Sequence, residues 1–209
     1  MAVIWEKFYP YIQPYLPGCP EIVIETHLKE AAAEFLACSE IRRFDIDNDF
    51  TSKSTKDYDL DTPTGAVLEN IYELLLDGRL LSRVSDRHVN GSRFLNNGSP
   101  MYYSIYQDSA IRFYPTPDKK YTFHGVGVLK PSLTATGVED WIYETHGRCI
   151  SYGAVARLAE VPGKEWHNPE IAAYYRSKFD MEADVAKSRD YRRVNLRVNS
   201  PTFAESRRT

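Results

Sequence analysis

The chain has 209 residues, enough to bury a core as one domain or two small ones. Apolar residues make up 43% and charged residues 26%, which is typical of a globular protein and argues against a disordered one. With a net charge of −3 and only short apolar runs, the composition favours neither bulk electrostatic binding of DNA nor a membrane span, and no membrane partner is expected.

The opening segment carries no basic stretch followed by a small-residue cleavage site, so no signal peptide is expected. Four prolines between residues 10 and 20 predict short, interrupted helical turns. The following segment, residues 21–43, predicts an amphipathic helix. Its buried face is formed by four residues at helical spacing: Ile24, Leu28, Ala31 and Phe35.

Between about Asp45 and Ser132 the helical period disappears. Residues 45–61 hold six Asp and two Lys and are expected to form a polar acidic loop. Asp77-Gly78, between two apolar runs, is a strong signal for a β-hairpin.

Three aromatic-rich runs follow, and residues 89–100 before them are expected to be a long exposed loop. The runs predict an antiparallel meander. In its last strand Tyr121, Phe123 and Leu129 are expected to share one face.

Two more helices are predicted after Pro131. Thr136 and Glu139 have the spacing of a capping box. The helix they introduce is expected to bury Val138, Trp141, Thr145, Cys149 and Tyr152. Asn168-Pro169 is expected to begin the last helix, as N-cap and first helical residue. Its buried stripe is expected to be Ala172, Tyr175, Phe179, Ala183 and Ala186.

None of these helices can bury its apolar stripe alone. The predicted fold class is therefore α+β: a discontinuous bundle of N-terminal and C-terminal helices, an inserted antiparallel β meander and an extended C-terminal arm. We expect residues 1–46 and 133–190 to form the helical bundle domain, 47–132 the β insertion domain and 191–209 the arm. Residues 190–209 carry a net charge of +3, which leaves −6 on the remainder.

Motifs for catalysis or metal binding are weak. Asp45, Asp47 and Asp49 resemble the opening of a calcium loop, but Phe50 and Lys56 stand where Gly and Glu are required. The three cysteines are widely spaced and make neither a disulfide framework nor a zinc site. The histidines lie in no metal-binding spacing: His27, His88, His124, His146 and His167. We therefore expect no catalytic residues, no metal and no cofactor.

Residues 153–193 resemble the head-to-tail adaptor proteins of tailed bacteriophages, the neck or head-completion family that includes the tail tubular A proteins. Members commonly carry a Gly-Ala-rich helix, a Pro-Gly-Lys-x-Trp turn and an Asn-Pro that opens a helix. The matching positions are Gly153, Ala154, Arg157, Leu158, Pro162, Gly163, Lys164, Trp166, Asn168, Pro169, Ala172, Tyr175 and Phe179.

Earlier segments agree with this resemblance in order and spacing. They are Trp5 to Tyr11, the opening helix, Asp77-Gly78-x-Leu80, Gly98-x-Pro100 and Tyr114 to Asp118. The chain departs from the family pattern in its last residues, where Ser200 to Phe203 are less basic than in the family. The exact contacts of the arm are open for that reason.

The resemblance implies a non-enzymatic virion protein of the neck, made in the bacterial host cytoplasm. It implies a twelvefold homo-oligomeric ring beneath the portal protein, with a tail or nozzle protein below. Genome DNA would pass through the ring without sequence-specific binding, and the net negative charge of the body suits such a channel.

The resemblance and the residue types together indicate three sets of contact residues. The arm is expected to bind the portal through Arg192, Arg193, Arg197, Phe203, Arg207 and Arg208. Loops of the β domain are expected to face the tail through Asp77, Gly78, Asn96, Asn97 and Asp118. Contacts between ring subunits are expected at Tyr11, Tyr15, Tyr174 and Arg176.

Two alternatives remain open. The first is a small soluble enzyme whose site gathers His124, His146 and His167 with the Asp45 cluster, which requires one shared pocket. The second is a DNA-binding module that uses the basic arm, which requires affinity that falls steeply with salt.

Overall fold

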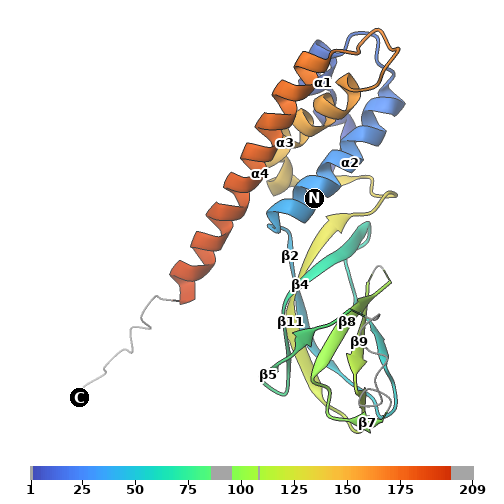
Figure 1. Cartoon of the computed structure of the whole chain (residues 1–209), viewed down its shortest axis with the longest axis vertical. Helices are drawn as coiled ribbons and strands as arrows, with labels where there is room; N and C mark the ends of the chain where they lie inside the picture. The colour runs from blue at the N-terminus through green and yellow to red at the C-terminus, as the bar shows by residue number, and fades with distance from the viewer. Residues whose placement is uncertain (1, 86–95, 108, 199–209) are drawn as a thin grey trace, which may run out of the picture.

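The computed structural model describes residues 2–85, 96–107 and 109–198, with the backbone alone described at 47–50 and 191–198. Helices gather at one end of the molecule and strands at the other, and the last helix projects past the first group (Figure 1). The elements in chain order are β1 (Ala2–Ile4), η1 (Trp5–Phe8), α1 (Tyr9–Ile12), η2 (Gln13–Tyr15), α2 (Glu21–Ser39), β2 (Arg43–Phe50), β3 (Asp57–Asp59), β4 (Ala66–Leu76), β5 (Arg79–Leu80), β6 (Ser82–Arg83), β7 (Asn97–Gly98), β8 (Tyr102–Tyr106), β9 (Ala110–Tyr114), β10 (Thr116–Pro117), β11 (Thr122–Pro131), β12 (Gly137–Glu139), α3 (Asp140–Ala159) and α4 (Pro169–Val198).

The helical unit, formed by η1 to α2 with α3 and α4, has a hydrophobic core drawn from both ends of the chain. The predicted stripe of α2 is confirmed, since Ile24, Leu28, Ala31 and Phe35 are all fully buried. The predicted stripe of α4 is confirmed as well, from Ala172 to Ala186. Asn168 begins α4 as predicted, because its side-chain oxygen accepts hydrogen bonds from the backbone N–H groups of Glu170 and Ile171.

The start of α3 differs from the expectation. Residues 137–139 form strand β12, which pairs with β1 at the N-terminus, and the helix begins only at Asp140. Glu139 pairs with Arg42 instead of completing a capping box. Of the residues expected to be buried here, Val138 and Cys149 are buried, whereas Trp141 and Thr145 are exposed. The buried face of α3 is formed by Ile142, Cys149, Ile150, Ala154, Val155 and Leu158 among others.

The β unit, within residues 43–131, has a second hydrophobic core of its own. Its two four-stranded sheets have the orders β2-β11-β4-β5 and β3-β9-β8-β6. Tyr121, Phe123 and Leu129 belong to this core, as predicted for one face of β11. The Asp77-Gly78 hairpin is also confirmed, since β4 and β5 pair across it.

The predicted sequential meander is wrong in its order. β8 and β9 do form an antiparallel hairpin, but β11 lies in the other sheet, between β2 and β4. The predicted acidic loop at 45–61 is also wrong in large part, because residues 43–50 and 57–59 are strands. Both errors have one cause, since pairing with strands distant in sequence overrides local polarity.

The C-terminal arm was expected to be extended from residue 191, yet α4 continues as a helix to Val198. Two ion pairs hold α4 before that point. Lys187 Nζ lies 3.1 Å from a carboxylate oxygen of Glu40, and Arg43 donates to Asp190 at 2.5 Å. Beyond these contacts the helix stands clear of both units (Figure 1). The arm is thus helical at least in its first eight residues.

Candidate interaction surfaces

Several tyrosines gather on one side of the helical unit. We call this surface the tyrosine face and define it by Pro10, Tyr11, Pro14, Tyr15, Arg148, Tyr152, Tyr174 and Lys178. Tyr11, Tyr15 and Tyr174 are exposed by 38%, 43% and 55%, which is unusual for such large apolar groups. Three of the four residues expected between ring subunits therefore lie together.

The prolines explain why α1 and η2 present these rings. Pro10 and Pro14 divide the segment into single turns, which hold Tyr11 and Tyr15 outward while Phe8 and Ile12 are buried. Tyr175 lies beneath the face, with its ring about 5 Å from the rings of Tyr15, Tyr152 and Tyr174. Burial raises the pKa of Tyr175, aided by its hydrogen bond with Tyr15, so its hydroxyl stays protonated.

A pocket of about 260 Å³ opens in the tyrosine face, between the prolines, Tyr11, Tyr15, Tyr152 and Arg148. Two cations stand at its margin. The Arg148 guanidinium lies 5.9 Å from the centre of the Tyr11 ring, and the Lys178 ammonium lies 4.7 Å from that of Tyr174. Within the part of the chain that the structure describes, neither cation has a carboxylate partner. The face therefore combines apolar walls with unpaired positive charge.

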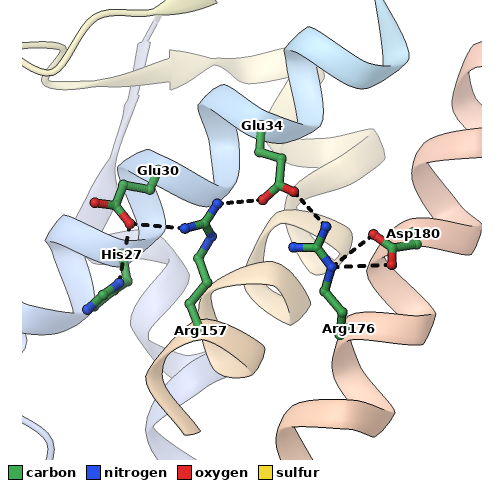
Figure 2. A network of polar contacts seen from close by, with 6 residues as sticks. All are labelled: His27, Glu30, Glu34, Arg157, Arg176 and Asp180. Atoms are coloured by element: carbon green, nitrogen blue, oxygen red, sulfur yellow. Dashed lines mark hydrogen bonds and ion pairs between the residues drawn. The ribbon is translucent and has the colours of Figure 1, made fainter. Parts of the chain in front are cut away.

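Arg176, the fourth residue expected at the ring contact, lies elsewhere. It donates to Glu34 at 2.7 Å and lies 3.1 Å from Asp180 (Figure 2). Two residues along a helix are about 160° apart around its axis, so Arg176 and Tyr174 flank opposite sides of the buried stripe. The Arg176 guanidinium is therefore already paired with two carboxylates of its own subunit.

The contacts of Arg176 extend into a network that joins three helices (Figure 2). Arg157 of α3 donates to Glu30 and Glu34 of α2 at 3.2 and 2.6 Å, and Glu34 also accepts from Arg176 of α4. Burial alone would raise the pKa of Glu34. The hydrogen bonds from Arg176 and Arg157 outweigh burial and hold that pKa below its ordinary value. The network fixes α4 against α2 and α3.

Loops expected to face the tail are brought together at the end of the β unit remote from the helices (Figure 1). The backbone N–H of Thr122 donates to the carboxylate of Asp77 at 2.9 Å, and the Tyr121 hydroxyl donates to Asp118 at 2.6 Å. The Asn97 side-chain amide donates to the Ser54 hydroxyl at 3.1 Å, and the backbone N–H of Ser54 donates to the carbonyl of Pro117 at 2.9 Å. Asn96 is exposed beside them. Gly78 shares the Asp77 turn.

The arm residues are described only in part. Arg192, Arg193 and Arg197 lie in the helical backbone of α4. Phe203, Arg207 and Arg208 lie outside the described residues.

The histidines of the enzyme alternative do not share a site. His124 is exposed on β11, His146 packs on Phe35 in the helical core, and His167 bonds to the carbonyl of Ala159. His88 falls outside the described residues. Among the described residues no three His, Cys, Asp or Glu side chains gather as metal ligands, and no helix is long and apolar enough to span a membrane.

Sequence reasoning missed three residues that give these surfaces their character. Arg148 meets Tyr11 only through the packing of α1 against α3, whereas Lys178 lies one turn after Tyr174 on α4 itself, so that spacing was a signal in the sequence. Glu34 was missed because it joins the ion-pair network only through the packing of α2 against α3 and α4. Glu30 and Glu34 are one turn apart on α2, so both lie within reach of one Arg side chain.

No curated protein matches the chain. A family model described as SU10 adaptor protein matches residues 14–201, which takes in α2, the β unit, α3 and all of α4. The chain therefore belongs to the SU10 adaptor protein family and is a structural adaptor protein of phages.

Proposed function

We propose that this adaptor forms a ring beneath the portal protein and joins the phage head to the tail. The observation that carries the proposal is α4, whose backbone continues as a helix past the ion pair at Asp190 and stands free of the body (Figure 1). A free helix of basic composition suits insertion into a partner, because its backbone is already ordered.

Two further surfaces, one on the β unit and one on the helical unit, are the proposed contacts with the tail and between subunits. The clustered loops around Asp77, Asn97 and Asp118 lie at the far end of the β unit and are the proposed contact with a tail or nozzle protein. The tyrosine face lies on the side of the helical unit and is the proposed contact between subunits. Tyrosine-rich surfaces are frequent at the centres of protein interfaces.

The negative net charge of the subunit body is consistent with the passage of DNA through the proposed ring. Residues 1–189 carry a net charge of −6, which disfavours binding to the phosphate backbone and leaves a duplex free to move. The proposed ring is twelvefold, lies in the virion neck and is assembled from subunits made in the host cytoplasm. No catalytic role is part of this proposal.

Light-scattering mass tests the proposal. The purified protein is measured alone and with its portal ring, and we expect a complex with about one adaptor per portal subunit. Two truncations separate the helix from the residues after it: deletion of 199–209 removes only the segment beyond α4, whereas deletion of 192–209 also removes its last turns. We expect the longer deletion to keep its circular dichroism spectrum and lose portal binding. Portal binding that survives this deletion excludes α4 as the docking element.

A further inference from the structure

The chemistry of the tyrosine face indicates what occupies it. The walls of its pocket are proline and tyrosine rings, and Arg148 at the margin has no carboxylate partner among the described residues. A cavity of about 150 Å³ accepts a group the size of benzene. At about 260 Å³, this pocket accepts a branched aliphatic side chain with a carboxylate beside it.

The N-terminus of α2 presents such a pair of groups. Ile22 is 71% exposed, although it lies two residues before the fully buried Ile24. Glu21 beside it is exposed and, unlike other carboxylates of this helix, has no ion-pair partner in the described part of the chain. Glu25 pairs with Lys29, and Glu30 pairs with Arg157. An exposed aliphatic group and a free carboxylate thus stand side by side.

Within one subunit α1 separates these two surfaces. Tyr9 is directed to α2, where its hydroxyl lies 3.5 Å from a carboxylate oxygen of Glu25. Tyr11 and Tyr15 are directed to the other side, toward Tyr143 of α3 and Tyr175 of α4. Ile22 is therefore placed to meet the pocket of another copy rather than its own.

We propose that the tyrosine face of one copy receives Ile22 and Glu21 from the α2 N-terminus of the next copy. Glu21 lies against Arg148 and Lys178, and Ile22 fills the pocket between Pro14 and Tyr15. The contact joins two different surfaces, so it is heterologous and repeats around a closed ring. This inference rests on the proposed function, because it names the contact by which the ring closes.

Cysteine cross-linking tests the contact directly. In a background with Cys19→Ser and Cys38→Ser, one protein carries Pro14→Cys and a second carries Ile22→Cys, while Cys149 stays buried. The two are mixed and mildly oxidised, with and without the portal ring. We expect a disulfide dimer containing one copy of each. Leu133→Cys, at a residue 82% exposed and outside both surfaces, replaces Ile22→Cys as the matched control. We expect about a tenfold lower yield from it.

The cross-linked products show which segment occupies the pocket of the tyrosine face. Dimers of Pro14→Cys with itself would overturn the proposal in favour of a face-to-face contact. Cross-links from Pro14→Cys to the portal would overturn it in favour of a portal segment in the pocket. Absence of the mixed dimer, while the same proteins still join the portal, overturns this contact alone and leaves the adaptor function intact. Failure of the unsubstituted protein to join the portal counts against the proposed function itself.

Charge reversal tests the polar half of the contact. Arg148→Glu with Lys178→Glu is expected to weaken mixed-dimer formation and ring assembly about tenfold, because the face then repels Glu21. Adding Glu21→Lys to the same chain is expected to restore most of the loss. Lys164→Glu, in the exposed loop before α4, is the matched control and is expected to have no effect. Equal losses from Lys164→Glu would show a general effect of net charge and overturn this pairing.

Discussion

Gly153 is the residue on which the packing of the three longest helices depends. A Cβ placed there would lie 2.7 Å from two carbons of the Phe179 ring and 3.1 Å from the Cβ of Ala31. Those distances are shorter than any relaxed carbon contact. The close approach of α3 to α4 and α2 therefore requires glycine, although glycine weakens a helix.

We expect Gly153→Ala to lower the free energy of unfolding by about 1–3 kcal/mol, the usual cost of overpacking a core. Helix propensity alone predicts the opposite sign, a gain of about 1 kcal/mol. Urea unfolding followed by circular dichroism separates the two. Ser177→Ala on the exposed side of α4 serves as control and should leave the midpoint nearly unchanged. A stabilised Gly153→Ala protein would contradict the close packing.

Glu34 predicts a dependence of stability on pH. Its pKa in the folded protein lies below its ordinary value near 4.3, so its contribution is present above that value and is lost as the pH falls through the folded pKa. Glu34→Gln is expected to cost about 1–3 kcal/mol at pH 7, because two Arg lose their shared acceptor. The cost should shrink below about pH 4. Urea unfolding at both pH values, with Glu144→Gln as exposed control, measures it.

The reactivity of the cysteines is expected to decrease with their burial. Burial raises the pKa of Cys149 to about 12, and its thiol donates to the carbonyl of Phe179. Cys38 is exposed on α2. We expect iodoacetamide to label Cys38 in the native protein and Cys149 only after unfolding, because the thiolate is the reactive species. Mass spectrometry of the labelled peptides gives the order. Rapid native labelling of Cys149 would show that the helical core opens.

At the scale of elements, two ion pairs hold the middle of α4 against residues 40–43, where α2 is joined to β2, one through a basic and one through an acidic residue of α4. Lys187 pairs with Glu40, and Asp190 pairs with Arg43, whose guanidinium also lies 4.9 Å from the centre of the Tyr72 ring. Each pair is worth about 0.2–1 kcal/mol when partly exposed. Lys187→Ala with Asp190→Ala should therefore speed hydrogen exchange at the backbone of residues 184–190 several-fold. Ser188→Ala, on the exposed side of the same turn, should leave exchange unchanged.

The hairpin between β4 and β5 depends on its backbone conformation. Asp77 and Gly78 have φ values of +47° and +78°, and nothing lies within 4 Å of a Cβ added to Gly78. The cost of Gly78→Ala is thus conformational alone, about 1–2 kcal/mol. Thermal unfolding of this variant, beside an exposed Asn96→Ala control, tests the value. An unchanged midpoint would mean that the turn relaxes to another form.

Elements were predictable where local pattern and final packing agree. Ala172 to Ala186 on α4 and Ile24 to Phe35 on α2 repeat with the helical period and are buried on that account. Residues 43–50 were missed because their aspartates indicate a loop, whereas β11 supplies a full row of hydrogen-bond partners. Trp141 was misplaced because its helical spacing was counted from Val138, which lies in strand β12, whereas α3 buries the neighbouring Ile142. The tyrosines of the candidate face were identifiable by residue type. Of the two cations, Lys178 lies one turn from Tyr174 on the same helix, whereas Arg148 reaches Tyr11 only through packing.

At the scale of the molecule, the body and the C-terminal segment carry net charges of opposite sign. Residues 190–209 carry +3 and the rest −6, so the full chain should bind duplex DNA weakly and with a steep loss on adding salt. A chain ending at residue 189 should not bind at all. Fluorescence anisotropy of a labelled duplex at 50 mM and 200 mM salt tests both statements. Tight binding at 50 mM salt that falls steeply at 200 mM and is lost in the shorter chain would favour the DNA-binding alternative.

Strand β11 connects the two ends of the subunit. It begins at Thr122, whose N–H is bonded to Asp77 in the distal loops, and ends at Pro131, next to the segment that leads into β12 and α3. At roughly 3.3 Å per residue it spans about 30 Å, braced on one edge by β2 and on the other by β4. A hydrogen-bonded strand held on both edges resists stretching. A displacement imposed on the distal loops is therefore carried as a rigid movement to the helices. If these loops contact the tail, as we propose, its attachment would reach the helical unit without any unfolding in between.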